Sequence, residues 1–445
     1  MDWCRSLCFI AIAATASSSA VAALQERTLD NGLRVIVKED HRAPTVAHMV
    51  WYHAGAIDET NGTTGVAHVL EHMMFKGTHQ VPVGQFSRRV AAAGGRDNAF
   101  TSRDYTAYFQ QVHKSKLSEM MRLEADRMAN LVILPEEFAK EIRVVMEERR
   151  TRTEDEPHAL VYETLSAIAY QSHPYHHPVI GWMADLESMK HEDALAWYKR
   201  WYAPNNAVVV VVGDVDTEVV FRDAAEIYGG IAPQPLPARK PQHEPPQRGI
   251  KRATVRAQAE LPYLMLGFKA PVLRDVEADW EPYALSVLAA VLDGHDSARL
   301  NRHLVREQLI ASQVGASFDM TARGPGLFLL DATPAEGKTT TDVEKSLRAE
   351  IESLQHDLVS ERELRRVKAQ AIAGQVYKRD SIFAQAMEIG QTETAGIHHS
   401  AIDRMLDKLK EVSAEQVREV ARKYLIDLNL SVVELDPQRP NKVSE

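Results

Sequence analysis

The chain contains two similar halves on either side of a proline-rich segment, and this duplication limits the folds that it can adopt. Residues 231–249 include six prolines among 19 residues. Proline lacks a backbone N–H and has a fixed φ, so this stretch cannot form the interior of a helix or a central strand. It is expected to be an extended, stiff linker. The linker separates segments of about 200 residues, a usual size for a domain.

Two pairs of segments show the similarity between the halves. Met189–Val212 and Val412–Leu435 align without gaps at an offset of 223, and each predicts an amphipathic helix, a short turn and an apolar strand. Gly65–Gly77 and Pro282–Gly294 align at an offset of 217 as helices that end at glycine. Chance amphipathicity is the alternative, but the matching order favours a duplication.

The predicted strands follow the same order in both halves. Leu33–Val37 and Ala47–Tyr52 correspond to Val255–Glu260 and Tyr263–Phe268. The run Val208–Val212 is the pattern of a strand that is buried on both faces. We therefore expect an α+β protein with two homologous α/β-sandwich halves, each an antiparallel-rich sheet plus helices. The expected domains are residues 23–230 and 250–445.

Residues 1–22 have the features of a secretory signal peptide. Arg5 supplies a positive charge, residues 7–16 are apolar, and Ala20-Val21-Ala22 is a cleavage site of small residues. Cleavage near Ala22 would place the protein in the periplasm or outside the cell. A buried N-terminal helix is the alternative.

Composition excludes several classes of function. Both cysteines, Cys4 and Cys8, lie in the expected signal peptide, so the mature chain would contain no disulfide and no thiolate metal site. The 52 basic and 62 acidic residues give a net charge of −10, which argues against nucleic acid as a partner. No further apolar window is long enough to predict a transmembrane anchor in the mature form.

The sharpest local feature is the sequence His68-Val69-Leu70-Glu71-His72. On a helix, His68 and His72 are one turn apart and share a face, so both imidazoles can reach one metal ion. Glu71 lies beside the second histidine. The pattern is H-x-x-E-H, the inverse of the H-E-x-x-H motif of metalloproteases.

A catalytic zinc ion needs a third protein ligand and one open position. The segment from residue 135 to 152 predicts a helix on which Glu141 and Glu148, two turns apart, share a face with Val144 and Val145 between them. Buried carboxylates are unfavourable unless they are paired or bound to a metal. The alternative is a solvated charged face, matched by neighbouring arginines.

This arrangement resembles the pitrilysin or insulinase-like family of zinc metallopeptidases (M16), which includes processing peptidases and their bacterial relatives. The resemblance covers nearly the whole mature chain and implies a clamshell of two halves. It implies one Zn²⁺ per chain with His68, His72 and Glu148 as ligands. It further implies that Glu71 is the general base and that Glu141 is an auxiliary acidic residue.

The second half serves as an internal control for the motif. The positions of His68, Glu71 and His72 correspond to Leu285, Leu288 and Ala289, and residues 364–379 contain no acidic side chain. The histidines and glutamates are therefore not required by the fold itself.

The resemblance also implies how a peptide is held. Gly94 and Gly95 predict a turn into a strand, and in the family the matching strand is an edge that pairs with extended substrate, with Asn98 and Ala99 at contact positions. An ordinary edge strand is the alternative.

The family uses an Arg and a Tyr, seven residues apart, from the second half to hold substrate. Arg306 fits the first position, but Gln313 replaces the tyrosine. Arg306 could equally be a surface residue in an ion pair. The replacement of the family's tyrosine by Gln313 suggests that a homologous subunit supplies the Arg/Tyr pair. The two chains would then form a heterodimer or a homodimer.

These features together predict an exported zinc endopeptidase that acts on short or unfolded peptides. A non-catalytic scaffold or peptide-binding subunit of the same fold is the rival function. Such a subunit is expected to have lost the motif, which this chain retains in full.

Overall fold

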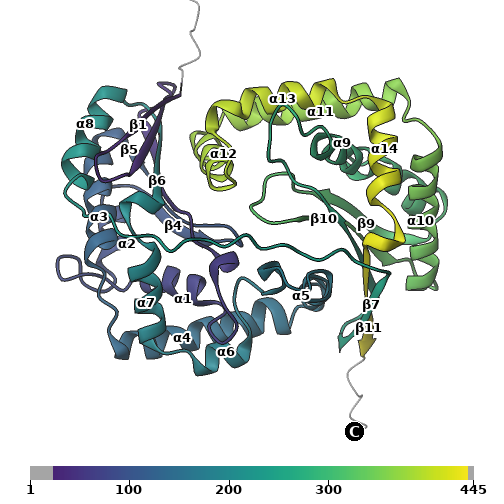
Figure 1. Ribbon diagram of the computed structural model, residues 1–445, viewed down its shortest axis with the longest axis horizontal. Helices are drawn as coiled ribbons and strands as arrows, with labels where there is room; N and C mark the ends of the chain where they lie inside the picture. Colours follow the sequence, from purple (N-terminus) through teal and green to yellow (C-terminus); the bar gives the residue numbers. More distant parts are fainter. Residues whose placement is uncertain (1–23, 439–445) are drawn as a thin grey trace, which may run out of the picture.

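The computed structural model describes residues 24–438 and divides them into two sheets with their helices (Figure 1). The expected signal peptide and its two cysteines lie outside the described residues. No helix in the described range is long and apolar enough to cross a membrane.

The sheet of the first half has six strands in the order β1-β2-β6-β3-β5-β4. Only β2 and β6 run parallel, and the other neighbours are antiparallel. Every residue of β6 is buried, which confirms the prediction for Val208–Val212. The strands are β1 (Gln25–Thr28), β2 (Arg34–Glu39), β3 (Thr45–Tyr52), β4 (Arg96–Thr101), β5 (Thr106–His113) and β6 (Ala207–Gly213).

Within residues 24–438, the sheet of the second half repeats this topology without a counterpart of β1. Its order is β7-β11-β8-β10-β9, again with one parallel pair, β7 and β11. The strands are β7 (Lys251–Gln258), β8 (Tyr263–Ala270), β9 (Ala311–Phe318), β10 (Gly326–Pro334) and β11 (Leu430–Gln438). The two sheets thus agree strand by strand, and the expected fold class is confirmed.

Helices cover one face of each sheet. In the first half, α1, α3, α7 and α8 pack on alternate residues of the strands, among them Val35, Val209 and Val211. The helices of this half are α1 (Val66–Met73), α2 (Gln85–Ala92), α3 (Leu117–Asn130), α4 (Pro135–Arg149), α5 (Pro157–Ala169), α6 (Met183–Ser188), α7 (His191–Trp201) and α8 (Thr217–Tyr228).

The second half is covered in the same way. Its core joins α9, α10, α11 and α14 to β8, β10 and β11. The helices are α9 (Glu281–Asp293), α10 (Thr340–His356), α11 (Glu361–Arg379), α12 (Ile382–Thr394), α13 (Ile402–Glu411) and α14 (Ala414–Tyr424).

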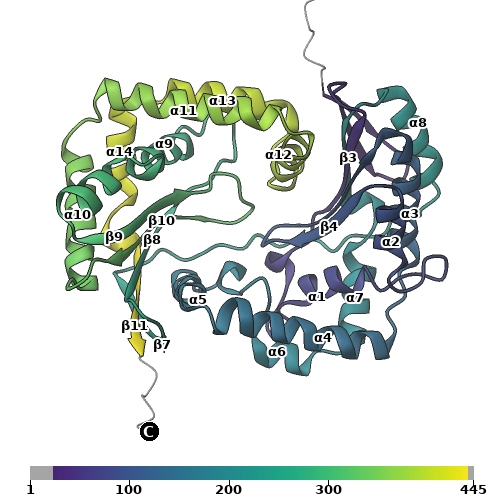
Figure 2. The same cartoon turned by 180° about the vertical axis from the view of Figure 1, so that it is seen from behind.

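One helix from each half packs on the sheet of the other half. Helix α12 of the second half packs through Ala386 and Ile389 on the remaining face of the first sheet, against Trp51 and Val210. Helix α5 of the first half packs on the second sheet through residues that include Leu165. Both views of the ribbon place α12 beside the first sheet and α5 beside the second (Figures 1 and 2). Separating the halves would therefore expose both faces to water.

The proline-rich linker is fixed to both halves. Glu244 accepts hydrogen bonds from the backbone N–H groups of Gln171, Ser172 and His173 (2.8–3.0 Å) and from Lys269 Nζ of β8 (2.7 Å). Although burial opposes ionisation, Lys269 and the three N–H groups lower the pKa of Glu244 to about 2. The linker is therefore one of several connections between the halves rather than a free hinge.

A glycine at the contact of α12 with the first sheet gives a test of this exchange. A Cβ atom at Gly390 would lie 2.0 Å from Cε2 of the fully buried Trp51. We expect Gly390→Ala to lower the free energy of unfolding by about 1–3 kcal/mol, because overpacking a closed contact forces neighbours to shift. Urea unfolding followed by tryptophan fluorescence measures the change.

The matched control is Gly374→Ala in α11, where a Cβ would meet nothing within 4 Å. This change should leave stability the same or raise it by about 1 kcal/mol, because alanine is the better helix former. Equal unfolding midpoints for Gly390→Ala and the wild type would contradict the close packing of α12 on Trp51.

Candidate metal centre

Helix α1, which contains the two histidines, is positioned by the buried side chain of Glu59 at its N-terminus. Glu59 accepts hydrogen bonds from the backbone N–H groups of Gly65 (2.8 Å) and Ala67 (2.9 Å), where the helix dipole favours negative charge. Burial nevertheless raises the pKa of Glu59 to about 8. Gly65 has a φ of +86°, and a Cβ there would lie 2.5 Å from the carbonyl oxygen of Ile180, so only glycine fits this start.

The structure brings His68, His72 and Glu148 together. Nε2 of His68 lies 3.9 Å from Oε1 of Glu148, and Nε2 of His72 lies 3.4 Å from Oε2. One ligand atom from each residue lies within 4.8 Å of the other two. Glu148 is on α4, so the cluster forms where α1 packs against α4.

This cluster fits a zinc ion by donor type and spacing. Two imidazoles and one carboxylate are a known ligand set of catalytic zinc, and zinc–nitrogen bonds of about 2.0–2.1 Å place tetrahedral ligands roughly 3.3 Å apart. Burial, together with the neighbouring His72, lowers the pKa of His68 to about 3. His68 is therefore neutral, the form that binds a cation.

Glu141 contacts the outer side of His72. Its Oε1 lies 3.0 Å from His72 Nδ1, and its other oxygen pairs with Lys76. Burial opposes ionisation of Glu141, but the hydrogen bonds from His72 and Lys76 outweigh it and lower its pKa. Burial likewise opposes protonation of His72, yet Glu141, Glu71 and Glu148 together raise its pKa. A carboxylate on Nδ1 leaves Nε2 directed at Glu148.

Glu71 is buried beside the cluster. Thr101, the last residue of β4, donates its hydroxyl proton to Glu71 Oε2. Burial raises the pKa of Glu71, although the bond from Thr101 and the charge of His72 act in the opposite direction. A carboxyl group with a raised pKa, held by one hydrogen bond, suits proton transfer near neutral pH.

Helix α4 differs in detail from the expected helix 135–152. It ends at Arg149, and a short π-helical segment, η3 (Arg150–Glu154), continues it. Arg152 in this segment pairs with Glu148. Val144 and Val145 lie on either side of the two glutamates, and they differ in burial: Val145 is buried, whereas Val144 is 50% exposed. Successive residues of a helix are about 100° apart, so the two valines flank the glutamates and Val144 takes the side that faces solvent.

Strand β4 lies at the edge of its sheet and ends at Thr101, next to the cluster. Asn98 pairs with Phe109 and Ala99 with Tyr108 of β5, and no strand among residues 24–438 pairs with the other side of β4. The side-chain oxygen of Asn98 accepts the backbone N–H of Ala99 (2.9 Å). That Asn98 and Ala99 contact a peptide stays a prediction.

The structure does not bring Arg306 to the cluster. Arg306 lies exposed in η6 (Asn301–Glu307), and neither a hydrogen bond nor an ion pair of this side chain occurs among the described residues. Gln313 of β9 lines a different cavity, with Glu156 and His158 at the start of α5. The role of Arg306 in substrate binding stays a prediction.

Three residues of the centre were not anticipated. Glu59 holds the N-terminus of α1, Lys76 pairs with Glu141, and Thr101 donates a hydrogen bond to Glu71. Each is a single polar residue outside the motif, so only the tertiary contact reveals it.

Comparison with known proteins agrees with this fold. The family model of insulinase (peptidase family M16) matches residues 34–181, and the family model of the peptidase M16 inactive domain matches residues 188–371. The zinc protease PqqE of Helicobacter pylori is 32% identical over 348 residues, 77% of each chain. An uncharacterized zinc protease of Bacillus subtilis, YmxG, is 25% identical over 91% of this chain and 96% of its own.

A solved structure shows the same architecture. The crystal structure of a protease from Helicobacter pylori superposes with a TM-score of 0.89 at 28% identity, covering 94% of this chain and all of the other. The chain thus belongs to the insulinase family of peptidases, M16. The relatives found by sequence are named zinc proteases.

The contact between Glu141 and His72 predicts an effect on metal affinity. We expect Glu141→Gln to weaken zinc binding about 10- to 100-fold, the usual cost of removing a carboxylate that orients a ligand histidine. Competition with a chromophoric chelator measures the affinity. Glu147→Gln is the control, because Glu147 lies exposed on the same helix and pairs with Arg150 at the surface. Unchanged affinity in Glu141→Gln would refute the orienting role.

Proposed function

We propose that this chain is a zinc-dependent endopeptidase that cleaves short or unfolded peptides. The observation that supports it best is the convergence of His68, His72 and Glu148, with Glu71 buried beside them. His68, His72 and Glu148 would hold one Zn²⁺. When bound, zinc supplies Lewis-acid chemistry: it lowers the pKa of water to about 7 and polarises the scissile carbonyl.

The residues around the ion would transfer the proton, orient the ligands and bind the peptide. Glu71 accepts the proton of the attacking water and passes it to the leaving amine nitrogen. Thr101 holds the Glu71 carboxyl group in place, and Glu141 orients His72. The free edge of β4, which ends at Thr101, would bind the peptide backbone in an extended form with Asn98 and Ala99 in contact.

A second subunit is part of the proposal. Gln313 stands where the family has a tyrosine, and Arg306 does not reach the metal cluster by a hydrogen bond or ion pair in the described part of the chain. A homologous subunit would supply the Arg/Tyr pair, in a heterodimer or a homodimer.

Export completes the proposal. Cleavage near Ala22 would release the mature enzyme into the periplasm or the medium. N-terminal sequencing of the protein purified from the extracytoplasmic fraction should give a first residue at or near Ala23. A chain that retains Met1 in that fraction would contradict the cleavage.

The general base can be tested separately from metal binding. We expect Glu71→Gln to lower turnover of a quenched fluorescent peptide by about 10²- to 10⁴-fold, because proton transfer is lost. Zinc content should stay the same, because Glu71 is not a ligand in the proposal. Glu147→Gln is the exposed control.

The same assay distinguishes the alternatives. Turnover that Glu71→Gln leaves intact would show that Glu71 is not the base. A wild-type chain with zinc but no turnover, alone or with a homologous subunit, would favour a scaffold role. Full turnover of the chain alone, unchanged by any second subunit, would contradict the partner.

A further inference from the structure

A second cluster of metal-binding side chains lies where the two halves meet. Glu26 of β1, His398 and His399 each offer a ligand atom within 4.8 Å of the other two. Oε2 of Glu26 lies 3.1 Å from Nε2 of His398 and 3.7 Å from Nδ1 of His399. The histidines follow α12 in the second half, 372 residues from Glu26 in the case of His398.

The surrounding contacts leave one oxygen of Glu26 directed at the histidines. Arg34 Nε occupies the other oxygen, Oε1, at 2.6 Å, and Arg34 also pairs with Glu393 (2.5 Å). Glu393 accepts the backbone N–H of His399 (2.7 Å) and contacts ring Nδ1 (2.8 Å). These contacts fix the ring of His399, and because its Nδ1 also faces Glu26 Oε2 (3.7 Å), a cation there would replace the proton that Nδ1 shares with Glu393.

The charge balance of the cluster favours a cation. Glu26 and Glu393 contribute two negative charges and Arg34 one positive charge, so with neutral histidines one negative charge is left over. Ser400 N–H donates to Nδ1 of His398 (3.3 Å), so the ring proton lies on Nε2 and faces Glu26. A cation would replace this shared proton, as metals do when they bind histidine.

We propose that Glu26, His398 and His399 form a second metal site that binds a borderline divalent cation, with Zn²⁺ the best match to two imidazoles and one carboxylate. The site is separate from the cluster on α1 and α4 and raises the expected content to two ions per chain. Because Glu26 belongs to the first half and the histidines to the second, the ion would link the halves beside α12.

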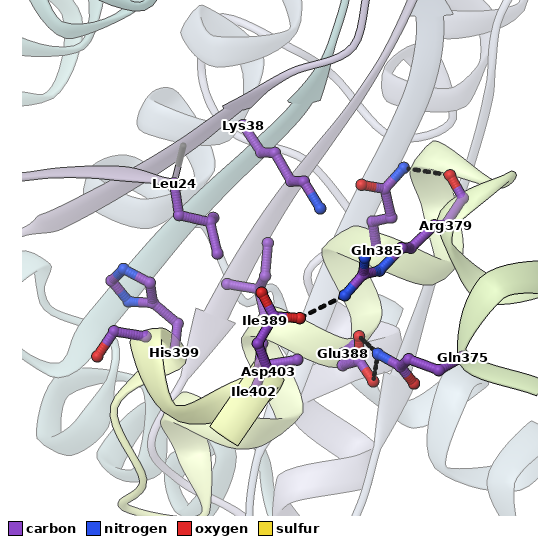
Figure 3. Close-up of a pocket in the computed structure, with 11 residues that line it drawn as sticks. Leu24, Lys38, Gln375, Arg379, Gln385, Glu388, Ile389, His399, Ile402 and Asp403 are labelled. Atoms are coloured by element: carbon purple, nitrogen blue, oxygen red, sulfur yellow. Dashed lines mark hydrogen bonds and ion pairs between the residues drawn. The ribbon is translucent and has the colours of Figure 1, made fainter. Parts of the chain in front are cut away.

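The cluster is accessible from solvent. The side chain of His398 is 56% exposed, and His399 lines a cavity of about 350 Å³ between β2 and the helices α11, α12 and α13. Figure 3 shows His399 on one side of this cavity, with Leu24 nearby and Lys38 on the opposite wall. An ion can therefore reach the cluster without unfolding the interface.

The test measures metal in a chain without the first centre. The full-length variant His68→Ala/His72→Ala is dialysed against Zn²⁺, passed through a desalting column and analysed for metal by mass spectrometry. We expect about one ion per chain, which His398→Ala added to this background should abolish, because two ligands rarely retain zinc. His356→Ala, which removes an exposed histidine of α10, is the control and should retain the ion.

The unfolding temperature is a second readout, which also detects variants that bind Zn²⁺ too weakly to retain it on a desalting column. Zn²⁺ should raise the unfolding temperature of the His68→Ala/His72→Ala background, because an ion that binds only the folded state stabilises it. The rise should disappear with His398→Ala or Glu26→Gln and persist with His356→Ala. A background variant that takes up no zinc, or zinc that His398→Ala does not affect, would overturn the second site. Peptidase activity plays no part in either readout, so the proposed function stands or falls separately.

Discussion

The contact between α1 and α4 is the interaction on which the proposed metal centre depends. It places two imidazoles and three carboxylates in a partly dehydrated space, where an uncompensated charge is costly. Each carboxylate has a partner there: Glu71 has Thr101, Glu141 has His72 and Lys76, and Glu148 has both histidines and Arg152. A divalent cation would compensate the remaining negative charge, which supports the proposal of a metal centre at this contact.

The second half shows the fold without this arrangement. Helix α9 takes the place of α1, and Leu285, Leu288 and Ala289 are buried in its core where the first half has His68, Glu71 and His72. Apolar packing at these positions needs no partners, so it is the simpler solution for stability. The polar cluster of the first half is therefore not required by the fold itself.

Local sequence patterns predicted the elements, and tertiary contacts determined the details. The run Val208–Val212 predicted a buried strand because burial on both faces requires apolar residues throughout, and β6 is such a strand. The duplication predicted two similar sheets. It could not predict that α5 packs on the sheet of the second half and α12 on the sheet of the first half. The sequence of an amphipathic helix does not specify which apolar surface the helix covers. Glu59 and Thr101 were missed for a related reason, since a single polar residue has no periodicity that identifies its partner.

The contacts between the halves also explain how the second half, which contributes no residue to the cluster of His68, His72 and Glu148, can influence that cluster. Arg323, in the loop between β9 and β10, pairs with Asp58 through both guanidinium ends, and its backbone N–H bonds to Asp104 (2.9 Å). Although burial opposes ionisation of Asp58, Arg323 and Arg239 of the linker lower its pKa.

Asp58 immediately precedes Glu59, which holds the N-terminus of α1, and Asp104 lies in the turn that follows β4 and Thr101. The loop of the second half thus braces both segments that position the histidine helix and its glutamate. A rigid active site needs such support from residues remote from the reacting atoms. The second half thus needs no ligand on its apolar helix to support the cluster, because the contacts of Arg323 hold two segments of the first half at one interface.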